Sequence, residues 1–195
     1  IDFVLVEPDN ASLIAQMAKP EIRIVSLTVT EGGYFINSAT GKFDPDAAEI
    51  RADAANPGKP ATAFGAIIAA LKVRRAAGEQ PFTIMSCDNL PGNGHVTRAA
   101  VVGLAELFDA EFATWIEANV AFPNGMVDRI TPGTGPRERA MAAEFGLADD
   151  PVPVTCEPFR QWVLEDNFPT GRPALEKVGV TFSNEVHAFE MMKLR

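Results

Sequence analysis

Two short apolar runs constrain the fold of this chain more than any other feature. Ile22 to Val29 reads IRIVSLTV and Phe82 to Cys87 reads FTIMSC, and each is followed by a polar loop that contains glycine. Strands that read as nearly continuous apolar runs are typically buried on both faces, as in parallel sheets covered by helices. The two runs therefore predict an α/β fold with a mostly parallel sheet.

Helical patterns separate these strands, as an α/β fold requires. Helices are expected between Pro8 and Pro20, at residues 64–77, 95–107, 113–118 and 137–145, and once more within the polar stretch 37–60. Further strands are expected at residues 1–6, 127–131, 152–156, 162–165 and 178–182. The alternation of the two patterns runs along the chain without an internal repeat.

Both ends of the sequence are abrupt. Ile1 to Val6 resembles a strand with no initiator methionine before it. The final residues, FEMMKLR, have the pattern of an amphipathic helix with no terminating residue after it. We interpret the chain as an internal piece of a longer protein.

Composition excludes several classes of protein. The net charge of −9 opposes non-specific binding to nucleic acid or to an anionic membrane. The longest charge-free apolar run, around residues 61–71, is too short to span a bilayer. The two cysteines, Cys87 and Cys156, and the two histidines lack the spacing of metal ligands. We therefore expect no metal site, and reduced thiols in a cytoplasmic protein; oligomeric state is left open.

Two loops follow the apolar strands, and ligands of open α/β sheets bind outside the carboxyl ends of the strands. The first loop, residues 28–34 (TVTEGGY), combines threonine hydroxyls and a carboxylate with paired glycines, and fits a hydroxyl-capped turn equally well. The second, residues 86–94 (SCDNLPGNG), places an Asp-Asn pair directly after a strand, which is more than a turn requires. The amide of Asn89 suits a ligand with a carbonyl or hydroxyl oxygen.

The glycine-rich fingerprint of dinucleotide-binding folds, G-x-G-x-x-G, is absent from the sequence. Gly133-Thr134-Gly135 supplies only the first two glycines, and Pro136 follows it. Either the chain binds no dinucleotide, or the fingerprint lies before Ile1.

Five stretches of sequence carry a family resemblance. They are SLTVTEGGY (residues 26–34), SCDNLPGNG (86–94), FPNGMVDRITP (122–132), CEPFRQWVLEDNFPTGRP (156–173) and FEMMKLR (189–195). In this order, and over essentially the whole chain, they resemble the polyol-specific long-chain dehydrogenases. The resemblance implies a metal-independent, NAD(P)-dependent oxidoreductase that interconverts a polyol and a ketose with a lysine general base. It also implies that residues 1–187 form the second half of a Rossmann-like domain and that residues 188–195 begin a helical domain.

The resemblance assigns roles to individual residues. Lys193 matches the lysine of the family's Lys-x-x-x-x-Asn-x-x-His motif, whose other members would follow Arg195. Asn89 matches an asparagine that bonds the substrate oxygen, and Asp128 matches a carboxylate at the substrate site. Glu190 matches an acidic residue that carries protons to or from the base. The residues implied for binding of the cofactor, NAD or NADP, are Thr28, Thr30, Glu31 and Asp88.

Elementary chemistry supports these catalytic roles. Oxidation of an alcohol requires removal of the hydroxyl proton and stabilisation of the developing alkoxide. A lysine accepts that proton only in its neutral form, which burial or a neighbouring positive charge favours. Glu190 lies three residues before Lys193, on the same helical face, and is placed to relay the proton, although its negative charge opposes the neutral lysine.

Three hypotheses for the function stay open at this point. D-mannitol and D-fructose are the pair that the resemblance favours, and D-fructuronate, reduced to D-mannonate, is the alternative. A cationic group near the site would discriminate the two, because the sugar acid carries an additional carboxylate. The third hypothesis is a non-catalytic fragment or degenerate paralogue that binds nucleotide or a partner. We expect His95 to be a helix-start residue, Trp162 to be a packing residue, and Arg160 to reach the substrate or a domain interface.

Overall fold

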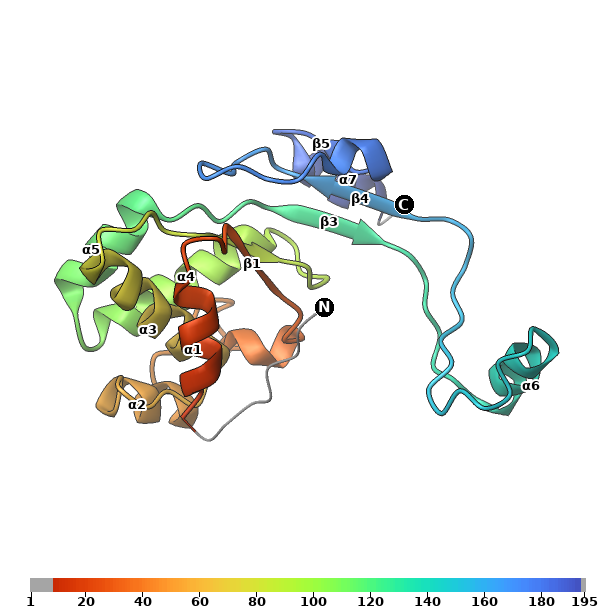
Figure 1. Cartoon of the computed structure of the whole chain (residues 1–195), viewed down its shortest axis with the longest axis horizontal. Coiled ribbons are helices and arrows are strands. Elements are labelled where there is room, and N and C mark those ends of the chain that lie inside the picture. Colours follow the sequence, from red (N-terminus) through yellow and green to blue (C-terminus); the bar gives the residue numbers. More distant parts are fainter. Residues whose placement is uncertain (1–8, 194–195) are drawn as a thin grey trace.

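The structure of the chain is a computed structural model, which describes residues 9–193 (Figure 1). Its elements are, in order, α1 (Ala11–Ala18), β1 (Ile24–Leu27), η1 (Glu31–Tyr34), α2 (Ala48–Ala55), α3 (Ala63–Ala76), β2 (Thr83–Ser86), α4 (Asn93–Glu106), α5 (Ala110–Asn119), β3 (Gly125–Asp128), α6 (Pro136–Glu144), β4 (Gln161–Leu164), η2 (Leu175–Val178), β5 (Thr181–Phe182) and α7 (Val186–Lys193). The strand expected at residues 1–6 lies outside the described residues.

The two apolar runs of the sequence form a parallel pair, β1 and β2. Ile24 lies opposite Thr83, and Leu27 lies opposite Ser86. The amide of Ile84 also donates a hydrogen bond of 3.0 Å to the carbonyl of Ala121, so the chain that leaves α5 runs beside β2. The prediction of a parallel α/β sheet is confirmed for this part of the chain.

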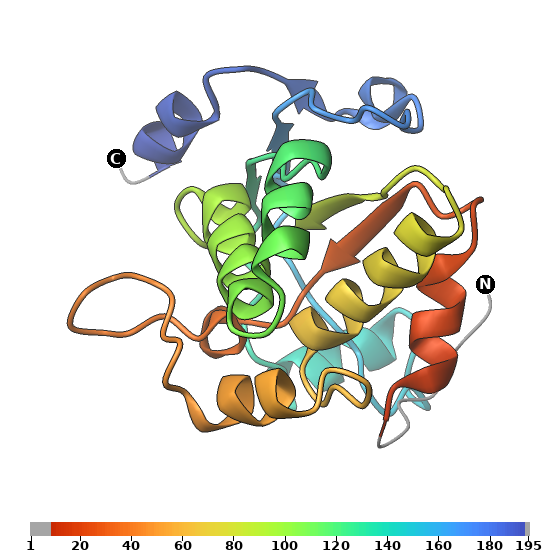
Figure 2. The same cartoon turned by 90° about the vertical axis from the view of Figure 1, so that its left-hand side faces the viewer.

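Five helices, α1 to α5, pack with these strands into one core (Figure 2). Phe64, Ile67 and Leu71 of α3 are buried in it, as the apolar stripe of that helix predicts. Gly94 allows α4 to approach the chain after α5, because a Cβ at this position would lie 2.4 Å from the carbonyl oxygen of Phe122. This close contact positions the polar loop between β2 and α4.

The second sheet is mixed rather than parallel. β3 and β4 are antiparallel, with Gly125 opposite Leu164, whereas β4 and β5 are parallel. Helix α7 covers this sheet, where Val186 and Phe189 pack on Met126 and Val163. The helix thus carries its last residue, Lys193, back to the strand that contains Asp128.

One strand prediction in this region is wrong and two are only partly right; of residues 127–131, only Val127 and Asp128 belong to a strand, β3. The expected strand at residues 152–156 does not form, because Pro151 and Pro153 interrupt it and the side chains of Val152 and Val154 are exposed. Only the last two residues of 178–182 are a strand, since η2 precedes them and Gly179 turns the backbone at φ 98°.

Residues 129–160 form an arm that extends away from both sheets and carries α6 (Figure 1). Its two chain segments contact each other through the Glu157 amide, which donates to the Ile130 carbonyl. Within residues 9–193, no helix is both long and apolar enough to cross a membrane.

Candidate active site

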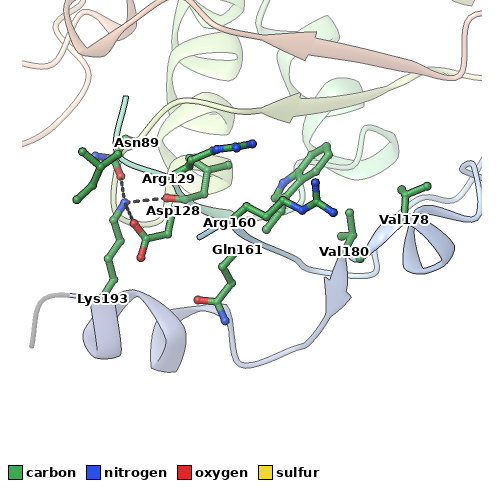
Figure 3. Close-up of a pocket in the computed structure, with 12 residues that line it drawn as sticks. Asn89, Asp128, Arg129, Arg160, Gln161, Val178, Val180 and Lys193 are labelled. Atoms are coloured by element: carbon green, nitrogen blue, oxygen red, sulfur yellow. Dashed lines mark hydrogen bonds and ion pairs between the residues drawn. The ribbon is translucent and has the colours of Figure 1, made fainter. Parts of the chain in front are cut away.

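A cavity of about 660 Å³ lies between the end of β3, the start of β4 and the end of α7 (Figure 3). Its polar lining residues come from four separate parts of the chain and are Asn89, Asp128, Arg129, Arg160, Gln161 and Lys193. Val178 and Val180 add an apolar wall on the opposite side. Such a cavity, mostly apolar with a few convergent polar groups, is typical of small-molecule sites.

Lys193 is held at this cavity by oxygen atoms of the loop after β2 and of strand β3. Its Nζ donates hydrogen bonds of 2.7 Å to Asn89 Oδ1 and of 2.7 Å to the carbonyl oxygen of Val127. The carboxylate of Asp128 lies 4.0 Å away. An ammonium group has three hydrogens, so one of them stays available for a ligand oxygen in the cavity.

The contact with Lys193 determines which end of the Asn89 amide faces the cavity. A protonated lysine can only donate, so Asn89 must present Oδ1 to it. The Nδ2 group is therefore directed away from Lys193 and can donate to another oxygen. In this geometry an amine and an amide donor lie side by side at the cavity, a pair that can exchange a proton with a ligand oxygen and donate a hydrogen bond to it.

Glu190 lies one helical turn before Lys193, behind the cavity. Its Oε1 accepts a hydrogen bond of 2.9 Å from the amide of Gly92, and its Oε2 lies 3.1 Å from His187 Nδ1. Glu190 and Lys193 both line a smaller cavity of about 200 Å³ beside the first. The side chain of Glu190 is only 12% exposed, so the hydrogen bonds are made in a partly desolvated setting.

The loop after β1 is held by Asp88 of the loop after β2. The Asp88 carboxylate accepts hydrogen bonds from the amides of Val29 and Thr30, at 2.9 and 3.1 Å, and from the hydroxyl of Tyr34 at 2.7 Å. Thr30 has a φ of 64°, which is unusual for a β-branched residue and is stabilised by this contact. Burial, followed by the hydrogen bond to Asp88, raises the pKa of Tyr34, so its hydroxyl stays protonated.

One buried residue of the site was missed by the sequence analysis. The side chain of Asn93 donates to the carbonyls of Ser86 and Asp88 and accepts from the amide of Gly125. It joins the end of β2, the polar loop and the start of β3, and it is completely buried. The sequence pattern places Asn93 in the loop of residues 86–94, whereas Asn93 is the first residue of α4 and the positive φ of 60° lies at Gly92.

The structure brings together only some of the predicted site residues. Asn89, Asp128 and Lys193 share the larger cavity, and Glu190 joins Asn89, Asp88 and Lys193 around the smaller one. Thr28, Thr30 and Glu31 are exposed beyond the carboxyl end of β1 and line neither cavity. His95 lies in the first turn of α4, as expected, and Trp162 of β4 packs with the cluster around Met85 and Leu164.

Comparison with known proteins places the chain in a family. The family model described as "Mannitol dehydrogenase Rossmann domain" matches residues 2–177. The chain belongs to the mannitol dehydrogenase family. The match covers β1, β2, the loop that holds Asp88 and Asn89, and strand β3 with Asp128, and it supports the Rossmann-like α/β fold inferred from the sequence.

Relatives within the mannitol dehydrogenase family include proteins named for two different substrates, mannitol and D-mannonate. A mannitol 2-dehydrogenase of Cereibacter sphaeroides is 72% identical over 195 residues, which are 100% of this chain and 40% of that protein. A D-mannonate oxidoreductase of Escherichia coli strain K12 is 50% identical over 184 residues, 94% of this chain and 38% of that protein. The chain thus spans about two fifths of the length of these relatives.

A solved structure has the same fold. It is a Pseudomonas fluorescens mannitol 2-dehydrogenase in a ternary complex with NAD and D-mannitol, and it matches with a TM-score of 0.85 and 54% identity. The match covers 94% of this chain and 37% of that one. The mannitol dehydrogenase fold therefore accounts for nearly the whole structure described above.

Proposed function

We propose that the chain supplies the nucleotide-binding part, and one wall of the active site, of an NAD(P)-dependent polyol dehydrogenase. The single observation that carries the proposal is the contact of Lys193 Nζ with Asn89 Oδ1 at 2.7 Å, at the wall of the 660 Å³ cavity. Lys193 and Asn89 are 104 positions apart in the sequence, and they meet at a cavity. This placement favours a role in a reaction over a role in stabilising the fold.

In this proposal the side chains divide the work at one substrate oxygen. Neutral Lys193 takes the hydroxyl proton when the alcohol is oxidised, and returns it when the ketone is reduced. Asn89 Nδ2 donates a hydrogen bond to the same oxygen as its negative charge develops. Asp128, 4.0 Å from Lys193, accepts hydrogen bonds from the neighbouring hydroxyls of the substrate. Glu190 exchanges the proton with Lys193 through the smaller cavity that both residues line.

The loop after β1 fits a dinucleotide. Thr28, Thr30 and Glu31 are exposed at the carboxyl end of a parallel strand, the position at which such cofactors bind in open α/β sheets. The cofactor, NAD or NADP, supplies the hydride chemistry when it is bound. Asp88 contributes by holding this loop through Val29 and Thr30, because its carboxylate is already engaged there. We propose NAD as the cofactor, since the mannitol 2-dehydrogenase of the solved complex holds NAD.

D-mannitol and D-fructose are the substrates that we propose first. The relative with 72% identity is a mannitol 2-dehydrogenase, and the structure in complex with D-mannitol shares the fold. The second candidate is D-fructuronate, and the cationic lining of the cavity favours it. Arg129 and Arg160 both line the cavity that holds Lys193, and either guanidinium can pair with a sugar-acid carboxylate.

The domain division follows from the same proposal. Residues up to 187 belong to the Rossmann-like domain, and α7 from residue 188 onward begins a helical domain that completes the site in a longer polypeptide. A cytoplasmic location is proposed as well, because both cysteines are free thiols and Cys156 is exposed.

The experiment that tests the function is NADH consumption by the full-length protein, with D-fructose and D-fructuronate compared side by side. A higher kcat/KM for D-fructose supports the mannitol assignment, and a higher value for D-fructuronate supports the sugar-acid alternative. Replacement of NADH by NADPH in the same assay decides the cofactor. Absence of turnover with both substrates and both cofactors would overturn the enzymatic proposal in favour of a non-catalytic, nucleotide-binding protein.

A further inference from the structure

Glu190 forms a wall between two cavities. On one side is the 200 Å³ cavity that it shares with Lys193 and Asn89. On the other side is a cavity of about 500 Å³. Its lining residues come from the loop after β2, the start of α4, the position before β3, the position after β4, and α7 with the residues directly before it. Both cavities are large enough for several water molecules, and their linings offer the polar groups that water requires.

Both histidines of the chain line the 500 Å³ cavity, but only one of them contacts Glu190. His187 Nδ1 lies 3.1 Å from Glu190 Oε2, and the His187 side chain is 80% exposed. His95 instead bonds Asn124, whose amide reaches Glu165 at 3.1 Å. Of the two histidines, His187 is therefore the one that links the Glu190 carboxylate to an exposed imidazole.

An exposed pair at this helical spacing usually contributes little, about 0.2–0.5 kcal/mol. The pair of His187 and Glu190 differs because Glu190 is largely buried and its second oxygen is held by the amide of Gly92. That bond orients the carboxylate so that Oε2 faces the imidazole. Imidazole is also the side chain that binds and releases protons near neutral pH.

We propose that His187 is the solvent-side end of the proton path that serves Lys193, and that it acts through Glu190 rather than on the substrate. The proposal rests on the function proposed above. In the oxidative direction, the proton taken by Lys193 passes through the smaller cavity to Glu190, then from Oε2 to His187 Nδ1, and His187 releases one proton to solvent from Nε2. Reduction of the ketone uses the same path in reverse, so each turnover moves one proton in balance with the hydride.

Other charged groups face this path and shape its pH dependence. Lys193 lies on α7, the helix that also carries His187 and Glu190, and Glu185 is the residue directly before this helix. Asp128 approaches from β3, Glu165 follows β4, Asp88 lies in the loop after β2, and His95 belongs to α4. The charged groups that face this path are therefore mostly carboxylates.

The test compares His187→Gln with His95→Gln in the full-length protein. Glutamine keeps polarity and length but cannot carry a proton at neutral pH, and His95 is the matched control because it lines the same cavity without touching Glu190. In a dilute buffer without small proton carriers, we expect His187→Gln to lower kcat for mannitol oxidation about tenfold, below the loss of about 10²–10⁴-fold for a direct acid–base group. KM and the melting temperature should stay unchanged.

Rescue by buffer distinguishes proton transfer from a structural role. Imidazole at increasing concentration should restore kcat of His187→Gln and leave His95→Gln and the unsubstituted protein unaffected. Loss of kcat in His187→Gln without rescue, or an unchanged kcat, would overturn the inference while the proposed function stands. Failure of the unsubstituted protein to turn over any substrate would overturn both.

Discussion

The two parts of this molecule differ in how their apolar residues are packed. The part from α1 to residue 122 shares one large core, in which side chains such as Phe64, Ile84 and Leu104 are completely buried. The part from β3 to α7 has smaller clusters, one around Met126 and one around Leu164 and Val180 that Met85 of β2 joins, and it carries a solvent-exposed arm. Yet Lys193, Asp128 and Glu190 belong to this second part. The difference suggests that the first part provides stability and that the second carries most of the chemistry.

Among the contacts between the two parts, one polar loop reaches the residues of the candidate site. Residues 86–94 belong to the well-packed part, and they supply Asn89 to Lys193 and the Gly92 amide to Glu190. Asn93 fixes this loop to β3 through the amide of Gly125. The comparison therefore predicts that substitutions in the two parts have separable effects, and that loop substitutions affect both.

The largest expected effect is on catalysis, in the less well-packed part. Lys193→Met removes the proposed base, and kcat of the full-length protein should fall about 10²–10⁴-fold. Lys193 is partly exposed and packs in no core cluster, so the free energy of unfolding should change little. The assay is steady-state oxidation of D-mannitol. Lys72→Met is the matched control, since Lys72 pairs with Asp109 on the outside of the other part, and it should retain full activity.

The next effect is on stability, in the well-packed part. Phe64→Ala removes a completely buried ring that packs 5.6 Å from Tyr34 and 6.5 Å from Phe35, between ring centres. It should lower the free energy of unfolding by about 3–5 kcal/mol. Urea denaturation measures this change. Val186→Ala, in the small cluster on α7, should cost clearly less; an equal or larger cost there would contradict the division into a stable and a catalytic part.

Much of this division could be predicted from the sequence, and its limits have physical causes. The strands at residues 24–27 and 83–86 were predictable because a buried strand needs a continuous apolar run. The segment 152–156, where a strand was expected, has a shorter apolar pattern that Pro153 interrupts; Pro151 and Pro153 lack amide donors, and no partner strand lies beside it among the described residues. Local pattern does not reveal whether a partner strand is available.

The site was predictable only through the family resemblance. Lys193 by itself has the pattern of a helix-end lysine, and nothing local indicates that it contacts Asn89, 104 positions earlier. Asn93 was missed because a buried asparagine that links three backbone segments has no sequence pattern of its own. Arg129 was missed for a similar reason, since the arm brings it to the cavity. Contacts between distant segments depend on tertiary packing, and the periodicity of apolar residues along the sequence gives no information about it.

A smaller effect is expected at the loop that joins the two parts. Asn89→Ala removes the proposed donor to the substrate oxygen, and kcat should fall about 10²–10³-fold, the range found for one oxyanion donor. Asn89→Asp keeps an oxygen for Lys193 but removes the donor, so it separates the two functions of the amide. If Asn89→Asp retained full activity, the contact with Lys193 would be the important one, and the donor role would be wrong.

The smallest effect is expected at Tyr34, beneath the same loop. Tyr34→Phe removes hydrogen bonds of 2.6 Å to Ser86 Oγ and 2.7 Å to Asp88 Oδ2, and should lower the free energy of unfolding by about 1.5–3 kcal/mol because Asp88 is charged.

Burial and Asp88 raise the pKa of Tyr34 above its usual value of about 10, so the folded state binds this proton more tightly than the unfolded state. The stabilisation is therefore complete below about pH 10 and declines as the pH rises further. Tyr34 is the single tyrosine of the chain, so absorbance at 295 nm reports its ionisation directly. Tyrosinate should form only together with unfolding, whereas ionisation near pH 10 in the folded protein would show that the link between the two loops is open to solvent.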